Sequence, residues 1–324
     1  MRHALLIALV AACGAFGCTR GPAHGPDSGG RPPGVTTGRW VTGPRAGDQD
    51  LLAVDFVDAT HGWAVGDIAP SGSAIMFSPD GGHTWRAVTA TTEVLASVCF
   101  VTAERGWVAG YAGQIRRTDD GGRTWLTLRS ERESEVINSI FFVDSTHGWA
   151  AGGSGLLLRT VDGGATWLPV SVSPQTDLWS VRFATIDRGW IIGEGGLLQT
   201  SLDGGATWRP VATGTTKALM GLAVAADGTA VAVGEDGTIL RTDDGVAWVT
   251  VASPTEDSLN SVATDGAGVF RAVGSSGTCV TSRDAGRTWT LDEPASRNTL
   301  AAISAIDADH AVAVGRHGFT QLLD

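Results

Sequence analysis

A short motif that returns at nearly constant intervals constrains the fold of this chain more than any other feature of its sequence. The motif is a serine or threonine, one variable residue, Asp-Gly-Gly, another variable residue and Thr-Trp, as in TVDGGATW at 160–167. Its aspartates recur every 40 to 42 residues, at Asp80, Asp120, Asp162, Asp203, Asp244 and Asp284. Such a period is typical of folds built from stacked or radially arranged repeats, because a single repeat cannot bury its own apolar face.

A second motif keeps the same interval and is present once more than the first. It is Gly-Trp, two small or branched residues and Gly, at 62–66, 106–110, 148–152 and 189–193, with degenerate copies at 229–234, 269–274 and 311–315. The last repeat reaches Asp324, where a further aspartate motif would begin, whereas residues 38–46 resemble the segment that normally follows that motif. We therefore expect the strand containing Trp40 to complete the last repeat, which would close a ring and remove exposed sheet edges.

The repeats predict an all-β fold, a seven-bladed β-propeller over residues 38–324 with four strands in each blade. In the third blade the strands are expected at 136–144, 148–153, 156–162 and 166–172. Their runs are almost continuously apolar, which is typical of sheets covered on both faces. The Trp that ends each aspartate motif is expected to wedge against the neighbouring blade, since burying one Trp side chain contributes about 4–6 kcal/mol as an upper bound.

The aspartate motif is that of the Asp-box, or BNR repeat, and its residues fit a structural role. The Asp carboxylate is suited to accept backbone N–H groups in the turn between the third and fourth strands, Gly permits the positive φ of that turn, and the Thr hydroxyl closes it. The six aspartates stand one per blade. They are therefore not expected to form a catalytic or metal-binding set.

The first residues predict export and attachment to a membrane. Residues 1–18 combine Arg2 and His3 with an apolar stretch too short to span a bilayer, and they end in small residues before a cysteine, which resembles a lipobox. Cys18 is the expected lipid-attachment residue, with Cys13 as the alternative and a plain signal peptide cut near Gly17 as a third reading. Residues 19–37 are rich in Pro and Gly and predict a flexible linker. We expect an extracytoplasmic protein anchored to the bacterial cell envelope by lipid alone.

The charge of the chain bears on its partners, and the positions of two cysteines bear on disulfide formation. The net charge is −11 and the chain has no run of Lys or Arg, so nucleic acid is not an expected partner. Cys99 and Cys279 fall in blades two and six, too far apart to form a disulfide, and both are expected to be buried. We expect a monomer.

Enzymatic chemistry is not expected. A sialidase-like glycosidase needs an arginine triad, a Tyr–Glu nucleophile pair and an Asp acid. The only tyrosine, Tyr111, falls in a turn of blade two, and Arg182 is the one arginine on an innermost strand. The seven histidines are scattered through the chain, so we predict no metal or cofactor. A glycan-binding or degenerate glycosidase propeller is the alternative function.

One residue of the innermost strands differs from its counterparts in the other blades. The equivalent positions hold Leu52, Ala96, Asn138, Trp179, Met220, Asn260 and Ala301. Trp179 belongs to neither Trp-containing motif. It is expected either to plug the central channel or to offer a surface for stacking with a ligand.

The combination of the two motifs resembles the photosystem II assembly and stability factor family, whose members are seven-bladed propellers. Blades two and three carry the resemblance best, with GQIRRTDDGGRTW at 113–125 and GLLLRTVDGGATW at 155–167. The resemblance implies a non-catalytic, chaperone-like scaffold that binds a protein partner and assists assembly of a membrane complex.

The resemblance also implies that the partner is bound through an arginine-rich surface. Arg117, Arg159 and Arg241 occupy the arginine position of the motif. By sequence alignment alone, the corresponding residues in blades one, four, six and seven are Phe77, Gln199, Thr281 and Gln321. Together with Trp179, the three arginines are the predicted partner-binding residues.

Overall fold

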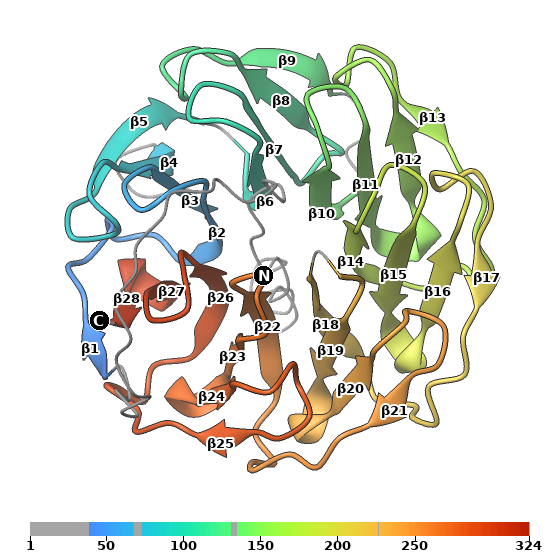
Figure 1. Ribbon diagram of the computed structural model, residues 1–324. Helices are drawn as coiled ribbons and strands as arrows, with labels where there is room; N and C mark the ends of the chain where they lie inside the picture. The colour runs from blue at the N-terminus through green and yellow to red at the C-terminus, as the bar shows by residue number, and fades with distance from the viewer. Residues whose placement is uncertain (1–38, 68–72, 92, 131–134, 226, 324) are drawn as a thin grey trace, which may run out of the picture.

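The computed structural model describes residues 39–67, 73–91, 93–130, 135–225 and 227–323. It consists of seven four-stranded antiparallel sheets arranged radially around a central axis (Figure 1). This confirms the predicted seven-bladed propeller. The predicted signal peptide at 1–18, the linker at 19–37 and both candidate lipid-attachment residues, Cys13 and Cys18, lie outside the described residues.

The strands follow one another outward from the axis in every blade. Blades one to three are formed by β2 (Leu51–Phe56), β3 (Gly62–Gly66), β4 (Ser73–Ser78) and β5 (Arg86–Ala90); β6 (Leu95–Phe100), β7 (Gly106–Gly110), β8 (Ile115–Thr118) and β9 (Leu126–Arg129); and β10 (Ile137–Phe142), β11 (Gly148–Gly152), β12 (Leu157–Thr160) and β13 (Leu168–Pro169). Blades four to six are formed by β14 (Leu178–Phe183), β15 (Gly189–Gly193), β16 (Leu198–Ser201) and β17 (Arg209–Pro210); β18 (Leu219–Val224), β19 (Ala230–Gly234), β20 (Ile239–Thr242) and β21 (Val249–Thr250); and β22 (Leu259–Thr264), β23 (Phe270–Gly274), β24 (Cys279–Ser282) and β25 (Thr290–Leu291).

The seventh blade takes strands from both ends of the described chain. It consists of β26 (Leu300–Ala305), β27 (Ala311–Gly315), β28 (Thr320–Leu323) and β1 (Trp40–Thr42). β1 pairs antiparallel with β28, with Trp40 opposite Leu323, and Figure 1 shows it on the rim beside the end of the chain. The Trp40 side chain is 3% exposed, and its Nε1–H donates to Asp292 Oδ2 of blade six at 3.0 Å. The predicted closure of the ring by an N-terminal strand is thus confirmed.

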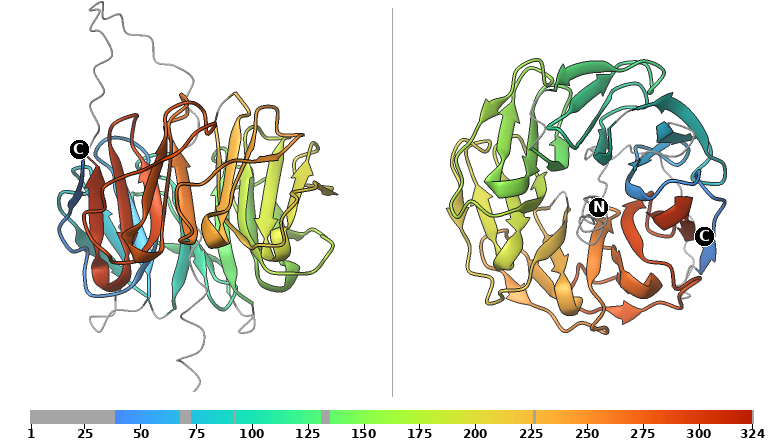
Figure 2. Two further views of the ribbon diagram at one scale, coloured as in Figure 1. Left: turned by 90° about the horizontal axis from the view of Figure 1, so that it is seen from below. Right: turned by 180° about the vertical axis from the view of Figure 1, so that it is seen from behind.

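The turns divide between the two faces of the disc seen edge-on in Figure 2. Since successive strands are antiparallel, the turns after strands one and three lie on one face and the turns after strand two on the other. We call the first the box face, because it carries the Asp-box turns, and the second the loop face. The loop face carries five single-turn 3₁₀ helices, η1 (Gly153–Gly155), η2 (Glu194–Gly196), η3 (Glu235–Gly237), η4 (Ser275–Gly277) and η5 (Arg316–Gly318).

The strands of blade three are shorter than predicted, although each is in the predicted place. The fourth strand contains only Leu168 and Pro169, against the predicted 166–172. The third strand ends at Thr160, because the residues after it belong to the Asp-box turn. Apolar runs therefore overestimated strand length where apolar residues continue into the turns.

Stacked aromatic rings join neighbouring blades. Trp149 on β11 is fully buried. Its ring stacks on Phe183 of the next blade with centroids 3.4 Å apart, and its Nε1–H donates to the Gly204 carbonyl of that blade at 3.0 Å. Trp208, which ends the Asp-box of blade four, meets Phe183 edge-on at 5.8 Å. The same ring arrangement recurs for Trp63 and Trp107.

The prediction that the Asp-box tryptophans pack against the neighbouring blade is confirmed, since Trp208 belongs to an apolar cluster formed by residues of blades three and four. The more deeply buried aromatic rings between blades are nevertheless the tryptophans of the Gly-Trp motif, because the second strand lies inside the blade and is covered on both faces. The Asp-box tryptophan begins the outermost strand, where one side meets solvent, and Trp208 is only partly buried.

Side chains on the innermost strands connect most blades to the next. Ser97 Oγ accepts a hydrogen bond from Ile140 N–H of the following blade at 2.9 Å. Asp55 Oδ2 in the same way accepts one from Phe100 N–H at 2.6 Å. Innermost strands of adjacent blades belong to different sheets, so their inward-facing N–H groups need side-chain acceptors. The channel wall is held together by these bonds.

Cys99 and Cys279 are both buried and unbridged, as predicted. In the described part of the chain, no helix has the length and apolar character needed to cross a membrane.

Candidate partner-binding surfaces

The Asp-box carboxylates are bound within their own turns. In blade two, Asp120 Oδ1 accepts hydrogen bonds from Thr124 N–H at 2.8 Å and from the Thr118 hydroxyl at 2.9 Å, while Oδ2 accepts the Thr124 hydroxyl at 2.6 Å. Gly121 has a φ of 72°, a conformation that favours glycine. The Thr124 hydroxyl and N–H are the main groups that lower the pKa of Asp120 to about 2. The carboxylate is thus ionised and already bonded at neutral pH.

The fifth Asp-box is one residue shorter and lacks the second threonine. Its Asp244 carboxylate accepts two backbone N–H groups instead, from Val246 at 2.8 Å and Ala247 at 3.0 Å. The Thr242 hydroxyl still donates to Asp244 at 3.1 Å. The aspartate therefore organises the turn even where the second threonine and one glycine of the motif are missing.

The predicted partner-binding arginines lie in the grooves between blades on the box face. Arg117 Nε donates to Asp119 and its Nη1 to the Gly163 carbonyl of blade three, and its side chain is 21% exposed. Arg241 pairs with Asp243 and is 5% exposed. Arg159 is half-buried. These arginines therefore contact the neighbouring blade, and this contact does not depend on a partner protein.

Strand register corrects two residues at the arginine position. Arg159 pairs with Trp149, so its counterparts are the residues opposite the same position of the second strand. In blade four this is Thr200, and in blade seven it is Leu322. The predicted Gln199 and Gln321 stand one residue earlier. Arg159 lies three residues before its Asp-box aspartate, and the same spacing from Asp203 gives Thr200. In blade seven Asp324 lies only two residues after Leu322, so it does not stand in the position of an Asp-box aspartate.

Trp179 lies at the loop-face end of the channel wall. It is the bulged residue of β14, between Leu178 and Ser180, which pair with β15. Its Nε1–H donates to Glu194 Oε1 on η2 at 3.0 Å, and the residue is 6% exposed. Little of the ring is available for stacking with a ligand.

The structure does not bring the four predicted partner-binding residues together. The three arginines lie toward the box face at three different blade interfaces. Trp179 lies on the innermost strand at the opposite face. A small ligand therefore cannot contact all four residues at once.

A buried carboxyl on the channel wall was missed by the sequence analysis. Asp55 on β2 is fully buried, and its Oδ1 has no hydrogen-bond partner among the described residues. Burial raises the pKa of Asp55 to about 7, while the hydrogen bond from Phe100 and the charge of Arg182 lower it. Arg182 stands at the equivalent position of β14, since Asp55 pairs with Trp63 and Arg182 with Trp190. Its Nη1 donates to Ser139 Oγ at 3.1 Å. Only comparison of equivalent strand positions would have singled out this pair.

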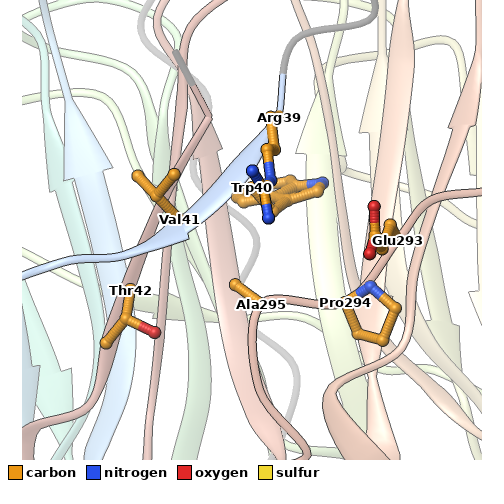
Figure 3. A pocket seen from close by; sticks show the side chains of 7 residues that line it. All are labelled: Arg39, Trp40, Val41, Thr42, Glu293, Pro294 and Ala295. Atoms are coloured by element: carbon orange, nitrogen blue, oxygen red, sulfur yellow. The ribbon is translucent and has the colours of Figure 1, made fainter.

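A hollow of about 360 Å³ lies beside the closing strand. Figure 3 shows its lining, with Arg39, Trp40 and Val41 of the β1 region on one side and Glu293 and Pro294 across from them. The hollow holds one basic and one acidic side chain, Arg39 and Glu293, together with the Thr42 hydroxyl.

Most of the metal-ligating residues and the tyrosine considered above can be placed in the described part of the chain. Among the described residues, no three His, Cys, Asp or Glu side chains gather closely enough to hold a metal ion. Tyr111 follows β7 on the loop face and forms an isolated bridge with Val136, just before β10. Burial and the neighbouring Asp67 raise the pKa of Tyr111, which makes it a poorer nucleophile.

Comparison with solved structures shows the same fold in several proteins. A structure described as YCF48 bound to D1 peptide matches with a TM-score of 0.71 at 21% identity, covering 90% of this chain and 97% of that one. YCF48 from Cyanidioschyzon merolae matches with a TM-score of 0.69 at 19% identity, covering 88% of this chain and 98% of that one. The WD40 β-propeller domain of Doa1 matches with a TM-score of 0.72 at 14% identity, covering 89% of this chain and 97% of that one. At these identities the likeness shows the fold alone.

Comparison of sequences is more specific. The chain is 30% identical over 129 residues to the Photosystem II assembly lipoprotein Ycf48 of Synechococcus sp. (strain CC9902), a match that spans 38% of this chain and only 34% of that relative. The family model of the photosynthesis system II assembly factor YCF48 matches residues 35–133 and 128–273, which is most of the propeller. The chain therefore belongs to the photosynthesis system II assembly factor YCF48 family.

Proposed function

We propose that this protein is a non-catalytic propeller scaffold that binds a protein partner and assists the assembly of a membrane complex. The observation that carries the proposal is the family match over residues 35–273, since it covers the propeller itself. The repeated polar residues of the blades support it, because Asp120 and its equivalents are bonded within their turns and are not free for chemistry.

Two relatives support the nature of the partner and the location. One similar structure is described as YCF48 bound to D1 peptide, so a relative with this fold binds a peptide. The relative from Synechococcus is described as a lipoprotein. By analogy we infer that this chain acts outside the cytoplasm, anchored to the cell envelope through lipid on Cys18, with Cys13 as the alternative.

For the binding surface we propose the box face around Arg117 and Arg159. Both guanidinium groups keep part of their surface exposed, and they lie at adjacent blade interfaces. Arg241 and Trp179 are almost fully buried, so we assign them a smaller part in binding.

The test is recovery of the partner from envelope membranes. The full chain, tagged and expressed in its own host, is crosslinked in membranes and purified, and the recovered proteins are identified by mass spectrometry. We expect a membrane-complex subunit with wild-type protein and a reduced yield with Arg117→Gln. Arg316→Gln, a substitution on the loop face, is the matched control. Recovery of no membrane protein, with normal levels of membrane complexes in a deletion strain, would refute the proposal.

Lipid attachment has a separate test. Metabolic labelling with a palmitate analogue should label the wild-type chain and Cys13→Ala but not Cys18→Ala. Label that survives Cys18→Ala and disappears with Cys13→Ala would move the anchor to Cys13. Absence of label from the wild type would contradict lipid anchoring altogether.

A further inference from the structure

Arginine side chains cover most of the Asp-box turns from the preceding blade. Arg117 Nη1 donates to the Gly163 carbonyl at 3.4 Å, and Arg241 Nε donates to the Ala285 carbonyl. A Cβ on Gly204 would lie 3.2 Å from Arg159 Nη2, and one on Gly245 would collide with Arg188. The turns of blades three, four, five and six therefore each lie under a guanidinium group of the blade before.

The Asp-box turn of blade one has no such cover. The preceding blade there is blade seven, in which Leu322 stands at the arginine position and Val312 at the position of the Gly-Trp tryptophan. In blades one to four that tryptophan donates to the first glycine carbonyl of the turn in the next blade, as Trp149 does to Gly204. No described residue donates to the equivalent carbonyl of Gly81. The turn of blade two lacks only the arginine, because Phe77 stands at that position of blade one, and the turn of blade six lacks only the tryptophan, which is Val231 in blade five. Among the described Asp-box turns, both groups are missing only at the interface of blades seven and one.

A cavity of about 220 Å³ occupies the place of the missing side chains. Its walls combine apolar residues of blade seven, among them Ile306 and Leu322, with the carboxylate-bearing residues Asp80 of blade one and Asp307 of blade seven. The cavity therefore has an apolar part and an acidic part, which match the stem and the head of a long basic side chain.

Both carboxyl groups are ionised at neutral pH. Partial burial works against the charge, but hydrogen bonds from Thr84 lower the pKa of Asp80, and those from Asp309 and His310 lower the pKa of Asp307. The cavity holds no basic side chain besides His83 and His310, each bonded through Nδ1 to a neighbouring acceptor. Its electrostatic character favours a cation.

We propose that this cavity, the blade-one socket, receives an arginine side chain of the partner protein. The proposal rests on the proposed function and locates one contact of the partner. Four arginines of the chain itself show that a guanidinium group fits against an Asp-box turn, and at Gly81 the acceptor is present without its donor. Arginine suits the socket better than lysine, because its planar group donates to a carbonyl and a carboxylate at once.

The first test uses a single arginine as the probe. The full chain is labelled with ¹⁵N-glycine and purified in detergent, and N-acetyl-arginine amide is titrated while the glycine amides are followed by NMR. We expect saturable shifts at Gly81 and Gly82, with a Kd on the order of millimolar for so small a ligand. N-acetyl-citrulline amide, which has nearly the same shape without the charge, should give none. Absence of saturable shifts, or equal shifts with citrulline, would overturn the proposal.

Three variants locate the probe. Leu322→Arg supplies the socket with its own guanidinium group and should abolish the titration. Thr200→Arg places arginine at the same strand position in blade four, where Arg188 already covers the next turn, and should titrate like the wild type. Asp307→Asn keeps an oxygen acceptor for its turn while removing the charge, so it should weaken binding several-fold even if Leu322→Arg does not fold. Unchanged titration of Asp307→Asn would count against the socket.

The second test separates the socket from the proposed function. The crosslinking experiment described above is repeated with the wild type, Leu322→Arg and Thr200→Arg. Loss of the partner in Leu322→Arg alone supports the proposal. Recovery of the partner by all three chains overturns the socket and leaves the proposed function standing, whereas no partner with the wild type overturns the proposed function itself.

Discussion

The buried carboxyl of Asp55 lowers the free energy of unfolding more at neutral pH than at pH 4. We expect a substitution that removes its charge to abolish this pH-dependent penalty. Its Oδ2 accepts the Phe100 N–H, but its Oδ1 has no partner among the described residues, and burial raises its pKa to about 7. In the unfolded chain the group has the ordinary aspartate pKa near 3.8. Above that pH the unfolded state is ionised, while the folded state must either stay protonated or hold a buried charge.

The magnitude follows from the two pKa values. Each unit of difference corresponds to about 1.4 kcal/mol, so folding is penalised by up to about 4 kcal/mol above pH 7. The penalty is below about 1 kcal/mol at pH 4 and grows through the interval between the two pKa values. Asp55→Asn keeps an oxygen acceptor for Phe100 N–H and has no charge to bury. We therefore expect it to stabilise the protein by about 2–4 kcal/mol at pH 8, with little effect at pH 4.

The assay is equilibrium unfolding of the wild type and Asp55→Asn in urea at pH 4, 6 and 8, with thermal melts alongside. For a propeller of this length, 1 kcal/mol corresponds to about 2 °C in Tm, so a gain of about 4–8 °C is expected at pH 8. Asp48→Asn, which removes an exposed carboxylate, is the matched control and should change neither curve. A gain that is the same at all three pH values, or a loss at pH 8, would refute the reasoning.

Three further predictions concern the stability of a blade interface, of an Asp-box turn and of the closing strand. Trp149→Leu should cost about 3–5 kcal/mol in urea unfolding, because it removes a fully buried ring and the donor to the Gly204 carbonyl, whereas Trp208→Leu should cost less. Asp162→Asn should cost about 0.5–1 kcal/mol at pH 7, since it loses the short bond from the Thr166 hydroxyl in an exposed turn. The pKa of Asp162 is lowered to about 2, so its stabilisation is present above pH 4 and is lost as pH falls toward 2, where the variant and the wild type should unfold alike in acid titrations. Trp40→Ala should lower stability by about 3–5 kcal/mol and expose both chain ends to limited proteolysis; an unchanged cleavage pattern would contradict closure by β1.

Repetition explains why so much of the fold was predictable. Seven copies of one pattern average out local ambiguity, so the blades and the order of their strands could be placed from residue types alone. The closing strand was predictable for the same reason. The last repeat lacks its fourth strand, and the segment around Trp40 is a fourth strand without a repeat of its own, so the two are expected to pair. Trp40 opposite Leu323 is that pair.

The contacts between blades were not predictable, because they depend on which face of a strand meets which neighbour. Sequence alone could not distinguish the fully buried Trp149 from the partly buried Trp208, since both kinds of tryptophan recur from repeat to repeat. It also could not reveal that Trp179 bonds to Glu194, because the bond depends on a bulge that shifts the strand register. At the arginine position, the spacing from Asp203 already gives Thr200 in blade four, whereas in blade seven only the pairing of β28 with β27 identifies Leu322.

Residues that occur once among seven equivalent positions are the ones most informative about function. A residue required by the blade must appear in most blades, as the Asp-box aspartates do, so its presence says little about what the protein binds. Asp55 and Leu322 have no counterpart of the same type at their positions in the other blades. The first places a carboxyl where most blades have a neutral side chain, and the second leaves an Asp-box turn without its guanidinium cover. Asp55 still accepts the Phe100 N–H of the next blade, and Leu322 packs in the apolar cluster of blades seven and one, so both residues also serve the ring. A neutral acceptor would make the first contact and an arginine stem would cover part of the second surface, so it is the buried charge of Asp55 and the missing guanidinium group at Leu322 that point to a role beyond packing.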